Sequence, residues 1–305
     1  EKEDFEIKKL CKSLNIDIAI DLNGYTKDSR SSIFKNKCAP IQINYLGFPG
    51  TMGDEVYDYI VADKTVIPEE DMKNYSEKII FMPDSFFPNS FKNENLKSNL
   101  KRGEFLLPND KFIFCCFNNI IKMNEFIVDI WSEILNSSEN SILWLSIPSN
   151  TKQNINILNE FDKRKVDLSR IFFSDKIEYQ KYLERFKLAD LFLDTYPYCG
   201  HTTSIEALNA GLPVLTLQGN SFQNRVSASL LKNLDLNELI TKNNKEYIKL
   251  ALELCRDREK LGFIKSKLIN QKKLSSIFNN QIYTKNLEKG YHEAYDQFVN
   301  QKKID

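Results

Sequence analysis

Short apolar runs of strand length alternate with amphipathic stretches along most of the chain. Runs that are rich in Ile or continuously apolar, and that are bounded by Gly, Pro or Asn, predict β-strands. They cover residues 16–22, 41–47, 78–83, 111–117, 141–147, 170–174, 190–195 and 212–217. The last five runs are apolar almost throughout, which is typical of parallel strands that are buried on both faces.

Helical spacing of apolar residues marks the segments between and after these strands. The predicted helices cover residues 125–135, 177–189, 203–210 and 225–233, and the chain after residue 235 is expected to be all-helical, with long helices at 245–268 and 281–298. The strand–helix alternation from residue 111 onward predicts a doubly wound α/β domain. A polar segment rich in Asn and Lys, residues 89–110, indicates either a linker between two domains or a long surface loop.

The composition excludes several classes of protein. The chain has 305 residues, of which 42% are hydrophobic and 28% charged, as is normal for a soluble globular protein of one or two domains. Because 42 Lys and Arg balance 42 Asp and Glu, no overall basic field points to nucleic acid or to an anionic membrane. No apolar stretch reaches the length of a membrane span. Six unevenly spaced cysteines predict reduced, mostly buried thiols in a cytoplasmic protein, and two widely separated histidines offer no zinc-binding set.

The segment LADLFLDTYPYCGHTTSIEALNAGLPVLTL, residues 188–217, carries the first candidate site. A buried strand is followed by an irregular loop, and Thr202 or Thr203 is expected to act as the N-cap of a short helix. A helix N-terminus just past the carboxyl end of a parallel strand attracts phosphate, and Glu206, one turn into the helix, can accept hydrogen bonds from ribose hydroxyls. The same pattern fits a plain capped helix with His201 on the surface, and spacing alone does not separate the two.

Two further segments place polar or Gly-rich loops after predicted strands. In CCFNNIIKMN, Asn119 and Lys122 follow a strand, where a lysine either reaches a diphosphate as a point charge or is a solvated loop residue. In DLNGYTKDSR and APIQINYLGFPGTMG, Lys27 and Gly47 lie in turns that either allow a close approach to a ligand or are only tight. Together the three weak signals suggest a nucleotide-sugar cleft between two Rossmann-like domains.

These segments, with YSEKIIFMP, ILWLSIP and RVSASLL, resemble the catalytic region of the O-linked N-acetylglucosamine transferase family along nearly the whole chain. This family includes the plant SPINDLY protein and bacterial relatives joined to tetratricopeptide repeats. The resemblance implies an α/β fold of the GT-B glycosyltransferase type, with two Rossmann-like lobes of which the first is truncated here, and a helical C-terminus. The domains it implies are the rest of the N-terminal catalytic lobe at 1–105, the nucleotide-sugar-binding lobe at 106–275 and a C-terminal helix at 276–305 that packs back across the lobes.

The resemblance also implies an activity. Family members transfer N-acetylglucosamine from UDP-N-acetylglucosamine (UDP-GlcNAc) to Ser or Thr hydroxyls of proteins, with inversion and without a metal ion or other cofactor. The implied partners are therefore a nucleotide-sugar donor and a protein or peptide acceptor, and upstream tetratricopeptide repeats are expected in the full-length protein.

The match assigns roles position by position. It makes Lys122 and His201 the expected catalytic residues, with Lys122 on the donor diphosphate. The remaining donor-binding residues that it implies are Lys27 and Asn119 near the diphosphate, Leu46, Gly47 and Pro49 at the sugar, Thr202 and Thr203 at the phosphates, Glu206 at the ribose in place of an Asp, and Tyr182 in the uracil-side loop. Tyr182 stands where the family has a histidine, which bears on the choice of base and sugar.

Three other interpretations remain open from the sequence. One is protein O-fucosyl transfer from GDP-fucose, as in SPINDLY, because both branches share these motifs. Another is the UDP-GlcNAc 2-epimerase reaction, which uses the same architecture but lacks this run of motifs. The third is a catalytically silent nucleotide-binding or interaction module, because the histidines that the family carries before DLNGYT are not in this chain, which opens as if in mid-helix.

Overall fold

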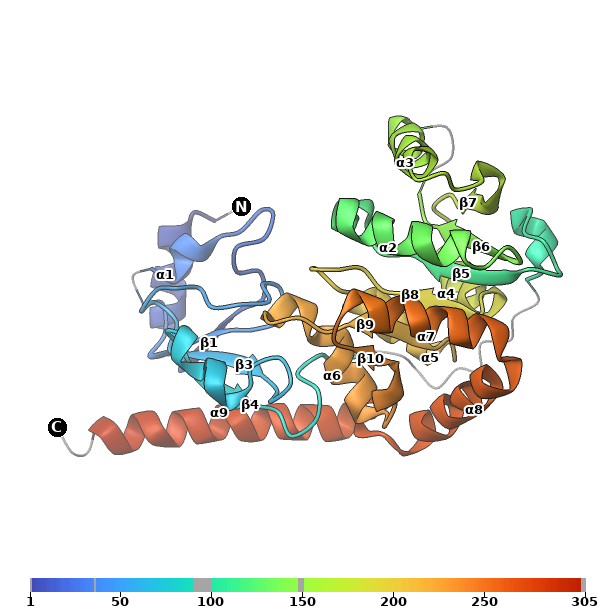
Figure 1. Cartoon of the computed structure of the whole chain (residues 1–305). Coiled ribbons are helices and arrows are strands. Elements are labelled where there is room, and N and C mark those ends of the chain that lie inside the picture. The colour runs from blue at the N-terminus through green and yellow to red at the C-terminus, as the bar shows by residue number, and fades with distance from the viewer. Residues whose placement is uncertain (1, 36, 90–99, 148–150, 303–305) are drawn as a thin grey trace. The chain divides into compact units, whose positions relative to one another are not determined.

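The computed structural model describes residues 2–35, 37–89, 100–147 and 151–302, which divide into two units (Figure 1). The first unit comprises Glu1–Asn89, Ser221–Gln223 and Asn279–Asp305, and the second comprises Ser90–Asn220 and Asn224–Phe278. Much of the polar segment predicted at 89–110 lies outside the described residues, and its remainder includes a short 3-10 helix, η3 (Arg102–Phe105). The three domains expected from the sequence, 1–105, 106–275 and 276–305, remain a prediction, which this division into two units does not test.

A four-stranded parallel sheet forms the centre of the first unit. Its strands lie in the order β1-β2-β3-β4, with β1 at Ile18–Asp21, β2 at Ile41–Asn44, β3 at Tyr59–Ala62 and β4 at Lys78–Phe81. The helices of this unit are α1 (Asp4–Ser13) and α9 (Asn280–Lys302), with the 3-10 helices η1 (Ser31–Ile33) and η2 (Glu69–Asn74). Every residue of β2 and β3 is buried, so the core of the unit runs along these two strands.

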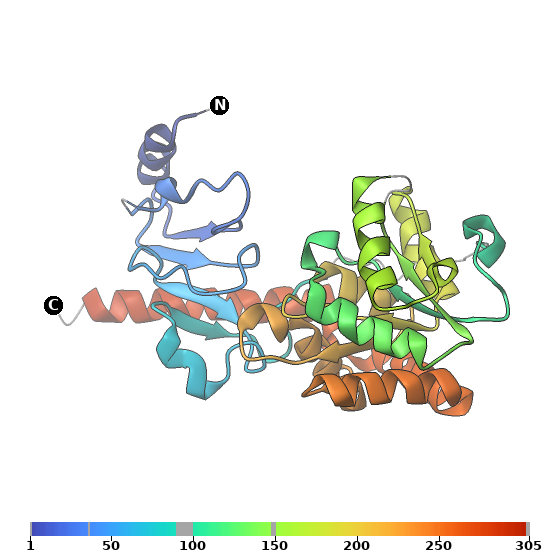
Figure 2. The ribbon, with the colours of Figure 1, turned by 45° about the horizontal axis from the view of Figure 1, so that its top comes forward.

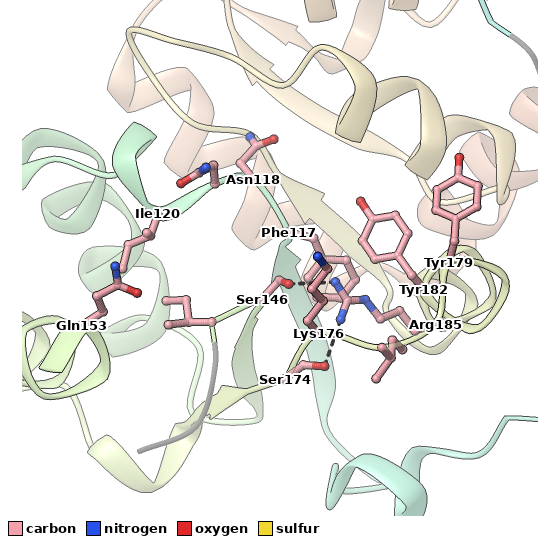
Figure 3. Close-up of a pocket in the computed structure, with 13 residues that line it drawn as sticks. Phe117, Asn118, Ile120, Ser146, Gln153, Ser174, Lys176, Tyr179, Tyr182 and Arg185 are labelled. Carbon is pink, nitrogen blue, oxygen red and sulfur yellow. Dashed lines mark hydrogen bonds between the residues drawn. The ribbon is translucent and has the colours of Figure 1, made fainter. Parts of the chain in front are cut away.

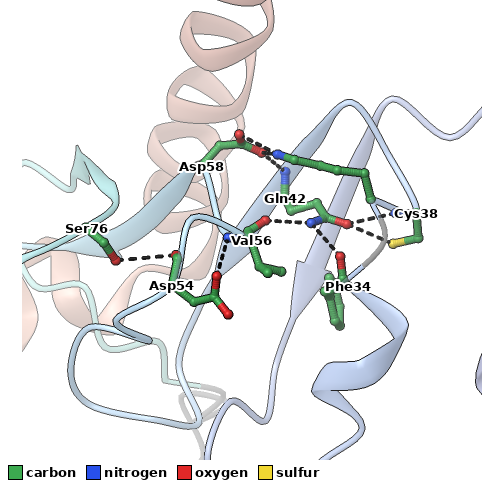
Figure 4. A network of polar contacts seen from close by, with 8 residues as sticks. Phe34, Cys38, Gln42, Asp54, Val56, Asp58 and Ser76 are labelled. Atoms are coloured by element: carbon green, nitrogen blue, oxygen red, sulfur yellow. Dashed lines mark hydrogen bonds and ion pairs between the residues drawn. The ribbon is translucent and has the colours of Figure 1, made fainter.

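One side chain on β2 ties the loops of the first unit together (Figure 4). The amide of Gln42 is fully buried; its oxygen accepts from the backbone N–H of Cys38 at 2.9 Å, and its nitrogen donates to the carbonyls of Phe34 at 3.1 Å and Val56 at 2.6 Å. The backbone N–H of Gln42 donates to Asp58 at 2.8 Å. A buried polar group that satisfies several backbone groups fixes the loop conformations around it.

The second unit is built on a six-stranded parallel sheet in the order β10-β9-β8-β5-β6-β7. Counted from β5 as the first strand, this is the order 3-2-1-4-5-6 of a doubly wound nucleotide-binding domain, with the switch point between β5 and β8. The strands are β5 (Phe112–Cys116), β6 (Ser141–Leu145), β7 (Ile171–Phe173), β8 (Leu191–Leu193), β9 (Val214–Leu217) and β10 (Ile240–Thr241). All residues of β5, β6, β8 and β9 are buried, as their continuous apolar character predicts.

Helices cover both faces of this sheet (Figures 1 and 2). On one side lie α2 (Glu125–Asn136), α3 (Lys152–Lys163) and α7 (Asn244–Arg256), with α2 in contact with both of the others. On the other side α5 (Thr202–Asn209) and α6 (Val226–Asn233) pack on β9 and on each other. The remaining helices are α4 (Tyr179–Arg185) and α8 (Arg258–Leu274).

All eight predicted strands are present, but the structure corrects several expectations. The region after residue 235 is not all-helical, because β10 pairs with β9. The predicted helix at 245–268 is two helices, since the Asp257 side chain accepts from the N–H of Lys260 at 2.8 Å and starts α8 there. The strands β3 and β10 and the helix α3 were not predicted. The expected apolar face of the C-terminal helix is present, with Ala294 buried and His292 exposed.

The contact of α9 with β4 leads to a test of the fold. A Cβ atom at Gly290 would lie 2.4 Å from the Ile80 side chain, whereas a Cβ at Gly262 in α8 would meet nothing within 4 Å. Both glycines lie within helices, so replacing either by Ala should gain up to about 1 kcal/mol of helix propensity. Crowding should cost the Gly290→Ala variant about 1–3 kcal/mol, and the Gly262→Ala variant should be the more stable of the two in urea unfolding. Equal midpoints would show that α9 does not pack closely on β4.

Candidate functional site

The loops after β5 and β8 meet at the switch point of the second sheet. Asn118 follows β5, and its side-chain amide donates to the Asp194 carboxylate at 3.0 Å and to the Thr195 hydroxyl at 2.8 Å, both just past β8. Asn118 is 4% exposed, and Asp194 and Thr195 are fully buried. The two strand ends are thus joined by side-chain hydrogen bonds at the edge where sheets of this order bind ligands.

Asp194 shapes the loop that leads from β8 to α5. Its carboxylate accepts from the backbone N–H of Thr195 at 2.9 Å and of Gly200 at 2.6 Å, and from the Thr216 hydroxyl at 2.8 Å. Burial raises the pKa of this carboxyl, while its hydrogen bonds, among them those from Gly200 and Thr216, oppose the rise. Gly200 is required by space, because a Cβ atom there would lie 2.1 Å from the Ser204 hydroxyl oxygen.

The N-terminus of α5 opens at this edge of the sheet. The N-cap is His201, without a side-chain capping bond, and Thr202 is the first helical residue, so the expectation that a threonine caps this helix is wrong. The His201 ring stacks on the Tyr198 ring, with centroids 4.9 Å apart at an interplanar angle of 29°. The backbone N–H groups of the first turn, which include those of Thr202 and Thr203, have no acceptor within a helix and suit an anion.

Lys122 lies against the same loop. It ends the 3-10 helix η4 (Ile120–Lys122), which is capped by Asn119: the Asn119 side-chain oxygen accepts from the Ile121 N–H at 3.1 Å. The Lys122 ammonium donates to the carbonyl of Cys199 at 2.8 Å and lies 4.2 Å from the centroid of the Tyr198 ring. Burial lowers the pKa of Lys122, and the charge of Asp194 counters part of this effect. Lys122 and His201, the two residues expected to be catalytic, therefore share one tyrosine ring.

A pocket of about 640 Å³ extends from this edge towards β6, β7 and α4 (Figure 3). Its most unusual lining residue is Arg185, which is 1% exposed and lies between the rings of Phe117 at 4.0 Å and Tyr182 at 4.6 Å. The guanidinium donates to the hydroxyls of Ser174 at 3.0 Å and Ser146 at 2.9 Å, and burial lowers its pKa to about 10. Among the described residues its Nε atom has no hydrogen-bond partner. The sequence reasoning missed Arg185, because Phe117, Ser146 and Ser174, which surround it together with Tyr182 of its own helix, come from other parts of the chain.

Glu206 connects the pocket to helix α5. Glu206 is 4% exposed, and its carboxylate accepts hydrogen bonds from the hydroxyls of Tyr179 at 3.1 Å and Tyr182 at 2.7 Å. Burial raises the pKa of Glu206, and the two tyrosine hydroxyls oppose the rise. Tyr182 and Glu206, two of the expected donor-binding residues, are thus in direct contact, and Tyr182 also packs against Arg185 in the pocket.

The expected donor-binding residues of the first unit lie in two neighbouring loops. Lys27 is exposed in the loop after β1, and Leu46, Gly47 and Pro49 follow β2. A Cβ atom at Gly47 would lie 2.2 Å from the carbonyl of Leu22, so the close approach of the two loops requires glycine there. The structure therefore brings these four residues to one end of the first sheet.

The described residues contain neither a metal-binding cluster nor a membrane-spanning helix. No group of three or more His, Cys, Asp or Glu side chains in this part of the chain lies together in a way that suits a metal ion. Likewise, none of the described helices combines the length and the apolar character that crossing a membrane requires.

Comparison with known proteins decides the family. The sequence profile of glycosyl transferase family 41 matches residues 8–98 and 92–287, which is most of the chain. The chain belongs to glycosyl transferase family 41. The resemblance described above is thereby confirmed, and Lys122, His201 and their neighbours lie within the matched range.

Relatives of this family member are similar along nearly all of its length. It is 36% identical over 298 residues to the probable UDP-N-acetylglucosamine–peptide N-acetylglucosaminyltransferase SEC of Arabidopsis thaliana, with 95% of this chain and 30% of the relative covered. The protein of the same description named SPINDLY from Petunia hybrida is 26% identical over 300 residues, which is 96% of this chain and 31% of that one. The chain thus spans less than a third of the length of these two relatives.

A solved structure establishes the fold. A mutant of the Thermobaculum terrenum O-GlcNAc transferase superimposes with a TM-score of 0.91 at 26% identity, covering 99% of this chain and 57% of that one. The parallel sheets flanked by helices, with the helical C-terminus, are therefore those of the GT-B glycosyltransferase fold, as the resemblance implies.

Proposed function

We propose that this chain is the catalytic region of an inverting glycosyltransferase that moves N-acetylglucosamine from UDP-GlcNAc to Ser or Thr hydroxyls of proteins. The names of the relatives, which describe transfer from UDP-N-acetylglucosamine to peptides, support this donor and this acceptor. The observation that carries the proposal is the convergence of Lys122 and the N-terminus of α5 on one loop at the switch point.

The chemistry of the proposal follows from where charge develops. The oxygen of an acceptor hydroxyl attacks the anomeric carbon and releases its proton to water, the bond from that carbon to the diphosphate oxygen breaks on the opposite face, and the leaving UDP takes the electron pair. Cationic and N–H donors that are already in place for this charge stabilise the transition state. Lys122 supplies the cation, and Thr202, Thr203 and the first turn of α5 supply backbone and hydroxyl donors. His201 and Asn119 border the same position.

The pocket beside this site suits the nucleoside of the donor. The aromatic rings that enclose Arg185 give a face on which a base can stack, and the guanidinium and Ser174 offer donors to its carbonyl oxygens. Glu206, which lies on α5 and is hydrogen-bonded to the pocket residues Tyr179 and Tyr182, is placed to accept from the ribose. In the first unit, Lys27 and the loop of Leu46, Gly47 and Pro49 are proposed for the diphosphate side and the sugar. The proposal needs no metal ion.

Transfer itself is the test of this proposal. The chain is incubated with a Ser/Thr-containing peptide and either UDP-GlcNAc or GDP-fucose, and the product is analysed by mass spectrometry and by NMR of the anomeric proton. We expect N-acetylglucosamine in β linkage from UDP-GlcNAc. Transfer of fucose instead would overturn the donor assignment, and nucleotide binding without transfer of either sugar would favour the catalytically silent nucleotide-binding module. The 26% identity to SPINDLY over 96% of the chain is the reason to include GDP-fucose.

The charge of Lys122 predicts the pH dependence of the reaction. Burial lowers its pKa from the ordinary value of 10.5, so the ammonium loses its proton, and the diphosphate loses this stabilisation, as the pH rises through the lowered pKa. We expect kcat/KM to fall on the alkaline side at a pH below 10.5, because this parameter reports the ionisation of the free enzyme. In the Lys122→Arg variant any remaining activity should not fall there, since a guanidinium keeps its proton. The same alkaline fall in both enzymes would assign it to another group.

A further inference from the structure

Two tyrosine hydroxyls are hydrogen-bonded to the carboxylate of Glu206, the group that the proposed function assigns to the ribose. Tyr179 and Tyr182 stand side by side on α4 with their hydroxyls on the same side of the pocket (Figure 3), and their rings are stacked at 17° with centroids 6.0 Å apart. Each hydroxyl donates to a different oxygen of Glu206, Tyr179 to Oε1 and Tyr182 to Oε2. Because Glu206 is 4% exposed, a ligand hydroxyl reaches an oxygen only by displacing or joining a tyrosine.

The two tyrosines are held very differently. Tyr182 forms the shorter hydrogen bond, 2.7 Å, and its ring packs over Arg185 at 4.6 Å and edge-on against Phe186 at 5.3 Å. These contacts on three sides fix the ring, so Tyr182 is the permanent partner of the carboxylate.

Tyr179 is the partner that can leave. It is the first residue of α4, it is 58% exposed, and its bond to Glu206 is 3.1 Å long. Its pKa is raised to about 12 by burial and by Glu206, so it is the protonated donor at neutral pH. When an exposed phenol swings out, water replaces its lost bond, whereas the buried carboxylate needs a new donor in exchange.

We propose that Tyr179 is an exchangeable cap on Glu206, which a hydroxyl of the ribose cis-diol replaces on Oε1 when the donor nucleotide binds, while Tyr182 stays on Oε2. This inference rests on the proposed function. The site thereby recognises the vicinal diol of a ribonucleotide, since a nucleotide without these hydroxyls leaves the cap in place and gains no contact with Glu206. Tyr179 lowers affinity for the ribonucleotide, and Tyr182 raises it.

The test compares two ligands and two tyrosine variants. UDP and 2′,3′-dideoxy-UDP are titrated by calorimetry at pH 8 into the unmodified chain, Tyr179→Phe and Tyr182→Phe. Because Tyr179→Phe removes a competing hydrogen bond, we expect it to bind UDP about threefold to tenfold more tightly. Its affinity for dideoxy-UDP should be unchanged, and Tyr182→Phe should bind UDP more weakly than the unmodified chain.

Two outcomes would overturn the exchange. One is that Tyr179→Phe binds UDP no more tightly than the unmodified chain, and the other is that it gains equally for dideoxy-UDP. If the unmodified chain binds neither UDP nor GDP, the proposed function itself fails, which is a different result. An independent measurement keeps the Tyr179 hydroxyl. In the chain labelled with 3-fluorotyrosine, the ¹⁹F chemical shift of Tyr179 should change when UDP is added and stay unchanged when dideoxy-UDP is added. A signal that ignores UDP would also contradict the exchange.

Discussion

Replacing Lys122 by Ala is expected to lower kcat/KM for glycosyl transfer by a factor of about 30 to 1,000, which corresponds to about 2–4 kcal/mol of transition-state stabilisation. The ammonium contacts the Cys199 carbonyl and the Tyr198 ring, in the loop that leads into α5. Its removal leaves the charge that develops on the diphosphate to neutral donors alone. The measurement is steady-state transfer with UDP-GlcNAc and a peptide acceptor.

The control for this variant is Lys181→Ala. Lys181 is exposed on α4 in the same unit and has no role in the proposed site, so kcat/KM should change by less than about twofold in that variant. Both variants should unfold at the urea concentration of the unmodified chain. Near-normal turnover by Lys122→Ala would contradict the assignment of this lysine to the leaving group.

The Asp194→Ala variant is expected to lose about 3 kcal/mol or more of the free energy of unfolding of the second unit. It leaves the backbone N–H groups of Thr195 and Gly200, the amide of Asn118 and the hydroxyl of Thr216 without the acceptor that they share in a fully buried position. Each unsatisfied buried donor costs about 1–3 kcal/mol. Removing the buried carboxylate also removes its desolvation cost, which offsets part of this loss of stability. The measurement is urea unfolding followed by hydrogen exchange of the loop amides.

Asp194→Asn is the matched control for this loss. The Asn side chain keeps an oxygen for the three N–H donors and turns its amide towards Thr216, so it should cost less than half as much as the alanine variant. Because burial raises the pKa of Asp194, loss of the charge alone does not weaken the fold. Equal losses in both variants would show that the charge, rather than the shared acceptor, holds the loop.

The sequence predicts most of the second sheet because its strands are continuously apolar. Two strands were missed: β10 has only two residues, whereas the apolar run of β3, Tyr59–Ala62, is as long as β1, β2 and β4, so its length does not explain the miss. Helix α3 buries only Asn154, Ile157 and Phe161, while its other apolar residues, Ile155 and Leu158, are partly or largely exposed, which blurs its helical pattern. The strand β10 exists because it pairs with β9, and the local pattern gives little sign of it.

In the candidate site, too, some residues have a local sequence signal and others do not. Lys122, His201 and Glu206 stand in local patterns, a strand followed by a polar loop, that predict their place at the edge of the sheet. Arg185 carries no such sign, because its burial depends on the Phe117 ring and on the hydroxyls of Ser146 and Ser174, which lie elsewhere in the chain. The cap of Tyr179 on Glu206 joins residues 27 positions apart and depends on how α4 and α5 pack. Contacts of this kind follow from tertiary structure and not from spacing.

The most direct test of the central claim, that the switch point of the second sheet binds a nucleoside diphosphate, is calorimetric titration of UDP into the chain and into its Lys122→Ala variant. We predict one UDP per unmodified chain and at least about tenfold weaker binding to the variant, since a charge-assisted contact with a phosphate is worth about 1.5–3 kcal/mol. Binding that is unchanged by the loss of Lys122, or no binding of UDP or GDP by the unmodified chain, would contradict the claim.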